Sequence, residues 1–191
     1  MARNGTPTRP RPGRATMAAE HAVLALLEVA GGTGHGYDLA RQFGAGGALG
    51  DVLRLETSML YHHLKKLERN GWATTTTEPQ GNRPPRQVHT LTDAGRDELK
   101  RWLAEPVERT RELRLDFLLK LYFARRLHPE NVASLIDRQR TILADALGRL
   151  DAQAADVPEG EDADFARDVL ALRQRQTQAA LNWLDGLSIN R

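Results

Sequence analysis

Apolar residues recur at helical spacing along most of this chain, and one segment, residues 72–92, breaks that pattern. It reads WATTTTE, then PQGNRPP, then RQVHTLT, which is two β-favouring stretches around a polar, proline-rich turn. Long helical stretches lie on both sides of it. The pattern therefore predicts a mainly α fold with one small β-hairpin.

Three helices are expected before the hairpin and one directly after it. They span residues 18–30, 36–43, 57–70 and 93–109. Gly31-Gly32 and Asn70-Gly71 supply helix ends, Thr92 is placed to cap the fourth helix, and Pro106 to bend or divide it. The second helix is expected to bury Tyr37, Leu39, Ala40 and Phe43. Three helices followed by a hairpin predict a winged helix-turn-helix domain, assigned to residues 17–110.

The third helix separates an apolar face from a basic one. Leu60, Leu64 and Leu67 lie at i, i+4 and i+7 and form the expected buried stripe. A helix fits the major groove of DNA, where its polar side chains read base edges, and arginines on a hairpin reach the minor groove or phosphates. The expected DNA-binding residues are Thr57, Ser58, Tyr61, His62, Lys65, Lys66, Arg69, Arg83 and Arg86. Taken alone, Lys65, Lys66 and Arg69 also fit an ordinary solvated helix face.

The distribution of charge supports a local basic surface rather than a basic protein. The net charge is +2, but residues 1–16 carry four arginines and no acid, so the remainder sums to −2. Residues 57–90 nevertheless sum to +3. Residues 1–16 are rich in Pro, Gly, Thr and Arg and are expected to form a disordered basic tail. That tail is either a passive extension or an arm that adds phosphate contacts.

Several other classes of protein are disfavoured. The chain has no cysteine, its six histidines lack metal-ligand spacing, and its glycine-rich residues 44–50 lack the lysine and hydroxyl of a phosphate loop. We therefore expect no catalytic, metal or cofactor site, and no enzyme. No stretch approaches 18 uncharged apolar residues, and no secretory signal is present. We expect a cytoplasmic protein with no membrane partner.

Residues 111–191 are predicted to form an α-helical dimerisation domain. Helices are expected at 114–127, 129–152 and 163–187, and residues 151–164 carry six acids and no base. The two long helices should pair antiparallel, and their apolar surface exceeds what one helical hairpin buries, so we expect a homodimer. The expected dimerisation residues are Leu115, Leu118, Leu119, Tyr122, Val132, Ile136, Leu143, Leu172, Trp183 and Leu187.

Trp102 and Trp183 have two interpretations. Planar ligands stack well on indoles, so these residues could line a small-molecule effector pocket at the dimer interface. The alternative is that both are packing residues of the core or the interface.

With the chain laid out in this way, residues 20–191 resemble the PadR family of winged-helix transcriptional regulators. The matching residues are His35-Gly36-Tyr37, Leu60-Tyr61, Leu64, Leu67-Glu68, Gly71, Arg86, Leu91 to Gly95, Asp116-Phe117, Lys120-Leu121 and Trp183 to Asp185. The resemblance implies a homodimer on a pseudo-palindromic operator, a phosphate contact from Tyr61 and a wing anchored by Arg86. The chain departs from the family at Val88 and His89, where the wing usually has two aromatics, and at Thr57-Ser58-Met59.

The sequence therefore predicts a sequence-specific DNA-binding regulator of transcription, a repressor in preference to an activator. It would bind double-stranded operator DNA as a homodimer, with a small-molecule effector as a further possible partner. The alternative is a winged-helix protein-interaction module whose helical half docks a partner protein.

Overall fold

The structure is a computed structural model that describes the backbone of residues 14–80 and 83–187 and the side chains of residues 17–79 and 85–187. Its elements, in chain order, are α1 (Arg14–Val29), β1 (Thr33–His35), α2 (Gly36–Phe43), α3 (Thr57–Arg69), β2 (Ala73–Gln80), β3 (Arg83–Leu91), α4 (Asp93–Ala104), the 3-10 turn η1 (Thr110–Glu112), the π turn η2 (Leu113–Phe117), α5 (Leu118–Leu127), the 3-10 turn η3 (Pro129–Asn131), α6 (Val132–Ala155) and α7 (Ala163–Asp185). The predicted mainly α fold with a small hairpin is confirmed.

Several boundaries differ from those predicted. Helix α1 begins at Arg14, inside the segment expected to be a tail, and residues 1–13 of that segment lie outside the described residues. Helix α4 ends at Ala104, just before Pro106, because proline cannot supply the backbone N–H that the helix would need. Within the described ranges no helix is long and apolar enough to cross a bilayer.

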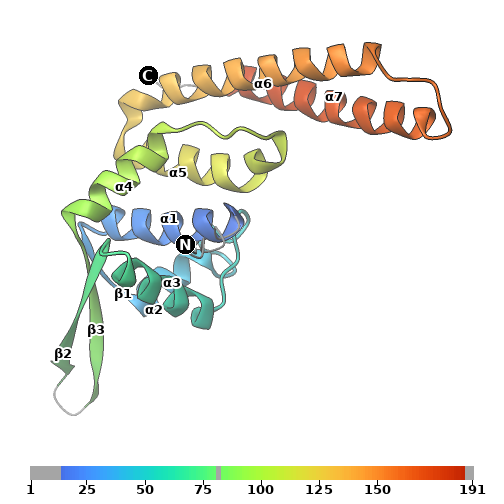
Figure 1. Ribbon diagram of the computed structural model, residues 1–191. Coiled ribbons are helices and arrows are strands. Elements are labelled where there is room, and N and C mark those ends of the chain that lie inside the picture. The colour runs from blue at the N-terminus through green and yellow to red at the C-terminus, as the bar shows by residue number, and fades with distance from the viewer. Residues whose placement is uncertain (1–13, 81–82, 188–191) are drawn as a thin grey trace, which may run out of the picture.

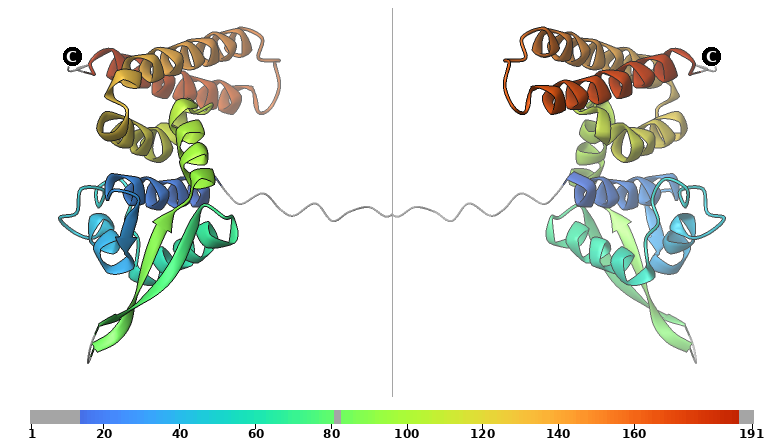
Figure 2. Two further views of the ribbon diagram at one scale, coloured as in Figure 1. Left: turned by 90° about the vertical axis from the view of Figure 1, so that its left-hand side faces the viewer. Right: turned by 90° about the vertical axis from the view of Figure 1, so that its right-hand side faces the viewer.

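The elements stack in three tiers (Figure 1). The wing, which is the β2–β3 hairpin, lies at one end with α2 and α3. Helices α1, α4 and α5 lie in the middle. The antiparallel α6–α7 hairpin covers the other end. The two side views in Figure 2 keep the same order. The long wing projects away from the α6–α7 hairpin, so the two ends of the molecule present separate surfaces.

The sheet has three strands rather than the predicted two. Its order is β1-β3-β2 and all pairs are antiparallel. Strand β1 is only three residues long and places His35 opposite Val88. The His35 ring Nδ1 lies 3.3 Å from the carbonyl oxygen of Gln87, to which it donates when protonated. A three-residue strand shows no alternation, which is why the sequence pattern missed it. Strand β1 joins the base of the wing to the start of α2, because it pairs with β3 and is followed directly by Gly36.

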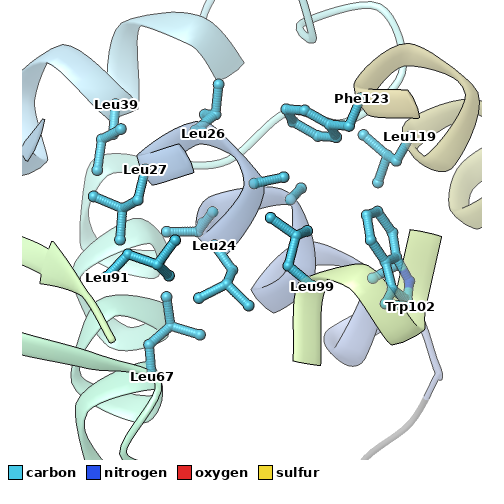
Figure 3. Close-up of a cluster of buried hydrophobic side chains, with 14 of the residues drawn as sticks. Leu24, Leu26, Leu27, Leu39, Leu67, Leu91, Leu99, Trp102, Leu119 and Phe123 are labelled. Carbon is cyan, nitrogen blue, oxygen red and sulfur yellow. The ribbon is translucent and has the colours of Figure 1, made fainter. Parts of the chain in front are cut away.

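The core of the winged domain is built around α1 (Figure 3). Leu24 and Leu27 of α1 are fully buried, and they pack with leucines from α2, α3, β3 and α4. Thr92 caps α4 as predicted, since its Oγ1 accepts a hydrogen bond from the Gly95 N–H at 3.1 Å. This core continues into α5 through Leu119 and Phe123, both fully buried. The winged domain and the first helix of the C-terminal half therefore share one core.

A second core lies between α5, α6 and α7. It contains Val132, Ile136 and Leu143, all buried inside one subunit. These three, together with Leu119, were expected at the dimer interface, and the structure instead gives them packing roles within the chain. Leu115, Leu118, Tyr122 and Leu187 are half-buried. Only Leu172 and Trp183 of the predicted set are exposed.

The expectation for Tyr37 is wrong. Its side chain is 69% exposed, whereas Leu39 and Phe43 of the same helix are buried. Tyr37 is in the first turn of α2, which faces the base of the wing rather than α1. The consequence is an exposed aromatic ring beside the predicted DNA-binding elements.

Candidate nucleic-acid interface

Helix α3 presents a polar face to solvent because its apolar stripe is held in the core. Leu60, Leu64 and Leu67 are buried as predicted. The side chains of Thr57, Ser58, Tyr61, His62, Lys65 and Arg69 are exposed. Gly71 closes the helix with a positive φ of 73°, a conformation that glycine adopts without a steric penalty. The orientation of the outward face is therefore fixed by burial of the inward one.

A surface hollow of about 630 Å³ joins α3 to the wing. Its lining residues come from β1, α2, α3 and β3, and they are His35, Gly36, Tyr37, Asp38, Tyr61, Pro85, Arg86 and Gln87. The structure thus brings together Tyr61 and Arg86, which are 25 positions apart in the sequence. The Tyr61 ring lies directly over Gly36, where an added Cβ would be 2.7 Å from the ring atom Cε1. Glycine at this position lets the ring lie flat against the start of α2.

The wing carries a partly neutralised cation. Glu78 and Arg86 face each other in the β2–β3 register, and Arg86 Nη2 lies 3.4 Å from Glu78 Oε2. Both side chains are about half exposed, so this pair is weak and easily exchanged for another anion. The backbone of Arg83 pairs with Gln80 in the same ladder. The Arg83 side chain lies outside the described side chains.

Lys66 differs from its neighbours on α3. Its ammonium donates to the carboxylate of Glu20 on α1, which is buried, and the Lys66 side chain is only 21% exposed. His63 is also buried, with its Nδ1 3.9 Å from the same Glu20 oxygen. Burial lowers the pKa of His63, and the attraction of Glu20 only partly opposes this effect. Lys66 is therefore part of an internal α1–α3 contact rather than of the exposed face.

Sequence reasoning overlooked two arginines beside the start of α3. Arg41 and Arg54 line a second hollow of about 370 Å³ that also contains Tyr37 and Thr57. Residues 17–56 sum to −3, so the charge of the whole segment concealed these local cations. The His35-Gly36-Tyr37 motif was the signal available for Tyr37. Folding places these residues next to the basic face of α3.

The two tryptophans do not share a site. Trp102 is buried, stacks on His21 with ring centroids 5.1 Å apart, and donates from Nε1 to Asp116 Oδ1 at 3.0 Å. It borders a cavity of about 210 Å³ between the winged domain and the helical half. Trp183 is partly exposed on α7 and borders a different hollow. In the described chain, Trp102 is mainly a packing residue.

The fold and the exposed face of α3 together define a winged helix-turn-helix protein. Comparison with known proteins gives the family. Residues 23–101 match the transcriptional regulator PadR-like family, and residues 113–187 match the virulence activator alpha C-terminal family. The chain belongs to the PadR-like family of transcriptional regulators.

Individual relatives agree with this assignment. The chain is 32% identical to the probable transcriptional regulator Rv1176c of Mycobacterium tuberculosis, over 88% of this chain and 95% of that protein. It is 34% identical to the negative transcriptional regulator PadR of Bacillus subtilis, over 63% of this chain and 64% of that protein. The structure is also similar to crystallised B. subtilis PadR in complex with operator DNA, with 28% identity, a TM-score of 0.44, and coverage of 87% and 94%.

Proposed function

We propose that this transcriptional regulator binds a pseudo-palindromic operator as a homodimer and represses transcription. The observation that carries the proposal is the hollow shared by α3 and the wing, where Tyr61 and Arg86 converge. The B. subtilis relative is a negative regulator and has been crystallised with operator DNA, which supports the same role here.

Each element would have a separate task. Helix α3 would enter the major groove, with Ser58, His62 and Lys65 toward base edges. Tyr61, Arg69 and Arg86 would contact phosphates, with Thr57 and Arg83 flanking them. Arg41 and Arg54, which border the hollow next to Thr57, extend the same basic surface. Lys66 is left out of this set because its ammonium is engaged by Glu20.

The test is selection of bound sites from a random pool of duplex DNA, followed by binding of the selected site at several salt concentrations. We expect an inverted repeat with half-sites about one helical turn apart, roughly 34 Å. The logarithm of the association constant should fall steeply with the logarithm of salt concentration, because each phosphate contact releases counterions. Failure to enrich any sequence, with no salt dependence, would favour a protein-interaction module instead.

The homodimer is proposed from the apolar surface that remains exposed on α7. Phe165, Val169, Leu172 and Trp183 are all exposed large apolar side chains of this helix. Their exposure in one subunit is the kind of surface that a partner covers. Sedimentation at micromolar concentration should show a dimer, and a stable monomer would contradict the proposal.

Small-molecule control is proposed at the 210 Å³ cavity beside Trp102. The cavity lies where the winged domain meets the helical half, and Lys120 lines it near the indole, with the Lys120 ammonium 5.4 Å from the Trp102 ring centroid. The B. subtilis relative has been crystallised with p-coumaric acid, which makes that acid a suitable probe. Titration should quench tryptophan fluorescence in the native chain and not in a Trp102→Phe variant.

A further inference from the structure

Helix α7 carries an apolar stripe that its own subunit leaves open at the far end. Phe165 is 72% exposed and Leu172 57%. Phe165 and Trp183 are 18 residues apart, which at about 100° per residue is five full turns, so both project in the same direction. Figure 1 shows the loop end of the α6–α7 hairpin reaching well past α5. Among the described elements, α7 packs mainly on α6 and η1.

The other end of the same face contains a hollow of about 660 Å³, which we call the Trp183 socket. Its lining residues are Thr110, Arg111, Leu113, Arg114, Leu118, Gln176, Ala179, Ala180 and Trp183. Small alanines form its α7 wall, and Trp183 is held edge-on against Phe117, with ring centroids 6.1 Å apart. The socket is wide enough and apolar enough to take an aromatic ring.

Phe165 cannot reach the socket of its own subunit. Phe165 and Trp183 lie on one continuous helix, and their separation of 18 positions places them about 27 Å apart at 1.5 Å per residue. When a molecule carries both a protruding side chain and a hollow that fits it, its copies assemble either as a closed dimer or as an open fibre. Here both are on the same face of one helix, so a two-fold axis between them closes the pair.

Charge favours the same pairing. The loop end of the hairpin next to Phe165 is acidic, with Glu161, Asp162 and Asp164 exposed. The socket is bordered by Arg111 and Arg114, both exposed and neither in an ion pair with another described residue. An antiparallel partner would bring acids to these arginines at both ends of the interface.

We infer that Phe165 of the partner subunit fills the Trp183 socket, with the two α7 helices antiparallel about an axis near residue 174. This inference rests on the proposed homodimer and specifies its register. Residue i would lie opposite residue 348 − i, which also places Val169 opposite Ala179. The socket would then be occupied in the dimer and closed to a small molecule, unlike the cavity beside Trp102.

The absence of cysteine makes the register directly testable. A disulfide forms only when the two Cα atoms lie within about 7 Å. The F165C/W183C double variant should therefore give a covalent dimer on a non-reducing gel after mild oxidation. Each single variant should not, because its two introduced thiols would lie on opposite ends of the interface. Mixing the two single variants should restore the cross-link.

A second pair of cysteine substitutions allows the register to be tested even if the first pair prevents folding. V169C/A179C changes two exposed positions and leaves the Trp183–Phe117 contact in place. It should also cross-link as the double variant and as mixed single variants. Cross-linking of F165C alone would overturn the register, and so would a dimer in sedimentation that neither double variant cross-links. In those cases the proposed homodimer would stand, so failure of the register is distinguishable from failure of the proposed function.

Charge and burial can be tested by dimer dissociation. F165E should raise the dissociation constant by on the order of a hundred-fold or more, because two aromatic rings lose their burial in each dimer. R114E should weaken the dimer, and E161R in the same chain should recover part of the loss. An unchanged dissociation constant in F165E would overturn the inference. The matched control is Q178E, which introduces the same charge at an exposed residue of α7 about 140° away from the stripe.

Discussion

The ammonium of Lys66 on α3 is held by the buried carboxylate of Glu20 on α1. Lys65, the preceding residue, is exposed. Adjacent residues on a helix point about 100° apart, so two neighbouring lysines face different surroundings. One lysine joins α3 to the core, and the other is exposed to solvent.

Substitutions of the two lysines should therefore have different effects, one on operator binding and the other on stability. K65A should weaken operator binding by on the order of 1–3 kcal/mol if Lys65 reads a base, with little change in stability. K66A leaves the carboxylate of Glu20 buried without its cation, so it should lower the free energy of unfolding by on the order of 2–3 kcal/mol. Urea unfolding and a binding titration on each variant measure both quantities.

The E20Q/K66M double variant is the control for this difference. It removes the charge and the cation together, so no buried ion is left without a partner, and most of the stability should return. If K66A instead weakens DNA binding as K65A does and leaves stability unchanged, Lys66 belongs to the DNA-binding face.

Two buried histidines make stability depend on pH. Burial lowers the pKa of His63 on α3 from its ordinary 6.5, with Glu20 opposing and His62 and Lys66 reinforcing the effect. Burial also lowers the pKa of His89 on β3, with Glu68 opposing and His35 reinforcing. Because the unfolded chain binds protons that the folded chain resists, the free energy of unfolding should fall as pH drops below about 6.5.

Urea unfolding at pH 7.5, 6.5 and 5.5 measures this decline. The limiting slope is about 1.4 kcal/mol per pH unit for each histidine. H63Q and H89Q should each flatten the curve, and the H63Q/H89Q double variant should flatten it further. Equal stability of the native chain at all three pH values would contradict the assignment.

The sequence predicted the winged domain well because α3 has one dominant apolar face, and α1, whose residues 18–27 are all buried, is apolar along most of its length. The stripe of Leu60, Leu64 and Leu67 alone indicates which way α3 faces. The C-terminal half was harder, because a stripe such as Val132, Ile136 and Leu143 looks the same whether it packs inside a subunit or between two. Periodicity locates the apolar face of a helix, but it does not indicate whether that face packs against the same subunit or against a partner. The structure distinguishes the two cases, because these three side chains are buried within one subunit and those of Phe165 and Leu172 are exposed.

Gly36 leaves space for the Tyr61 ring to lie against the start of α2. A larger residue at position 36 should therefore affect DNA binding more than stability. An alanine Cβ would lie within 3 Å of three atoms at the end of the Tyr61 ring, and that flexible side chain can move away. G36A should therefore displace Tyr61 at little cost in stability and weaken operator binding about as much as Y61A does. In the G36A/Y61A double variant the two effects should not add, because both remove the same contact. Additive losses would show that Gly36 acts separately.

Two glycines at helical positions should respond in opposite ways to alanine. Gly95 in α4 lies so close to the wing that an added Cβ would be 2.1 Å from the Trp72 carbonyl oxygen, a backbone atom. The Thr92 N–H donates to this oxygen at 3.0 Å, so it cannot easily shift. G95A should therefore lower the free energy of unfolding by about 2–3 kcal/mol.

Gly148 in α6 has no described atom within 4 Å of an added Cβ. In this open helix interior, alanine avoids the entropic cost of glycine, and G148A should raise the free energy of unfolding by roughly 0.5–1 kcal/mol. Urea unfolding of both variants under identical conditions measures the two changes. Since both substitutions add the same methyl group, opposite signs would separate close packing at α4 from free space at α6. A stabilised G95A would show that α4 is further from the base of the wing than the structure places it.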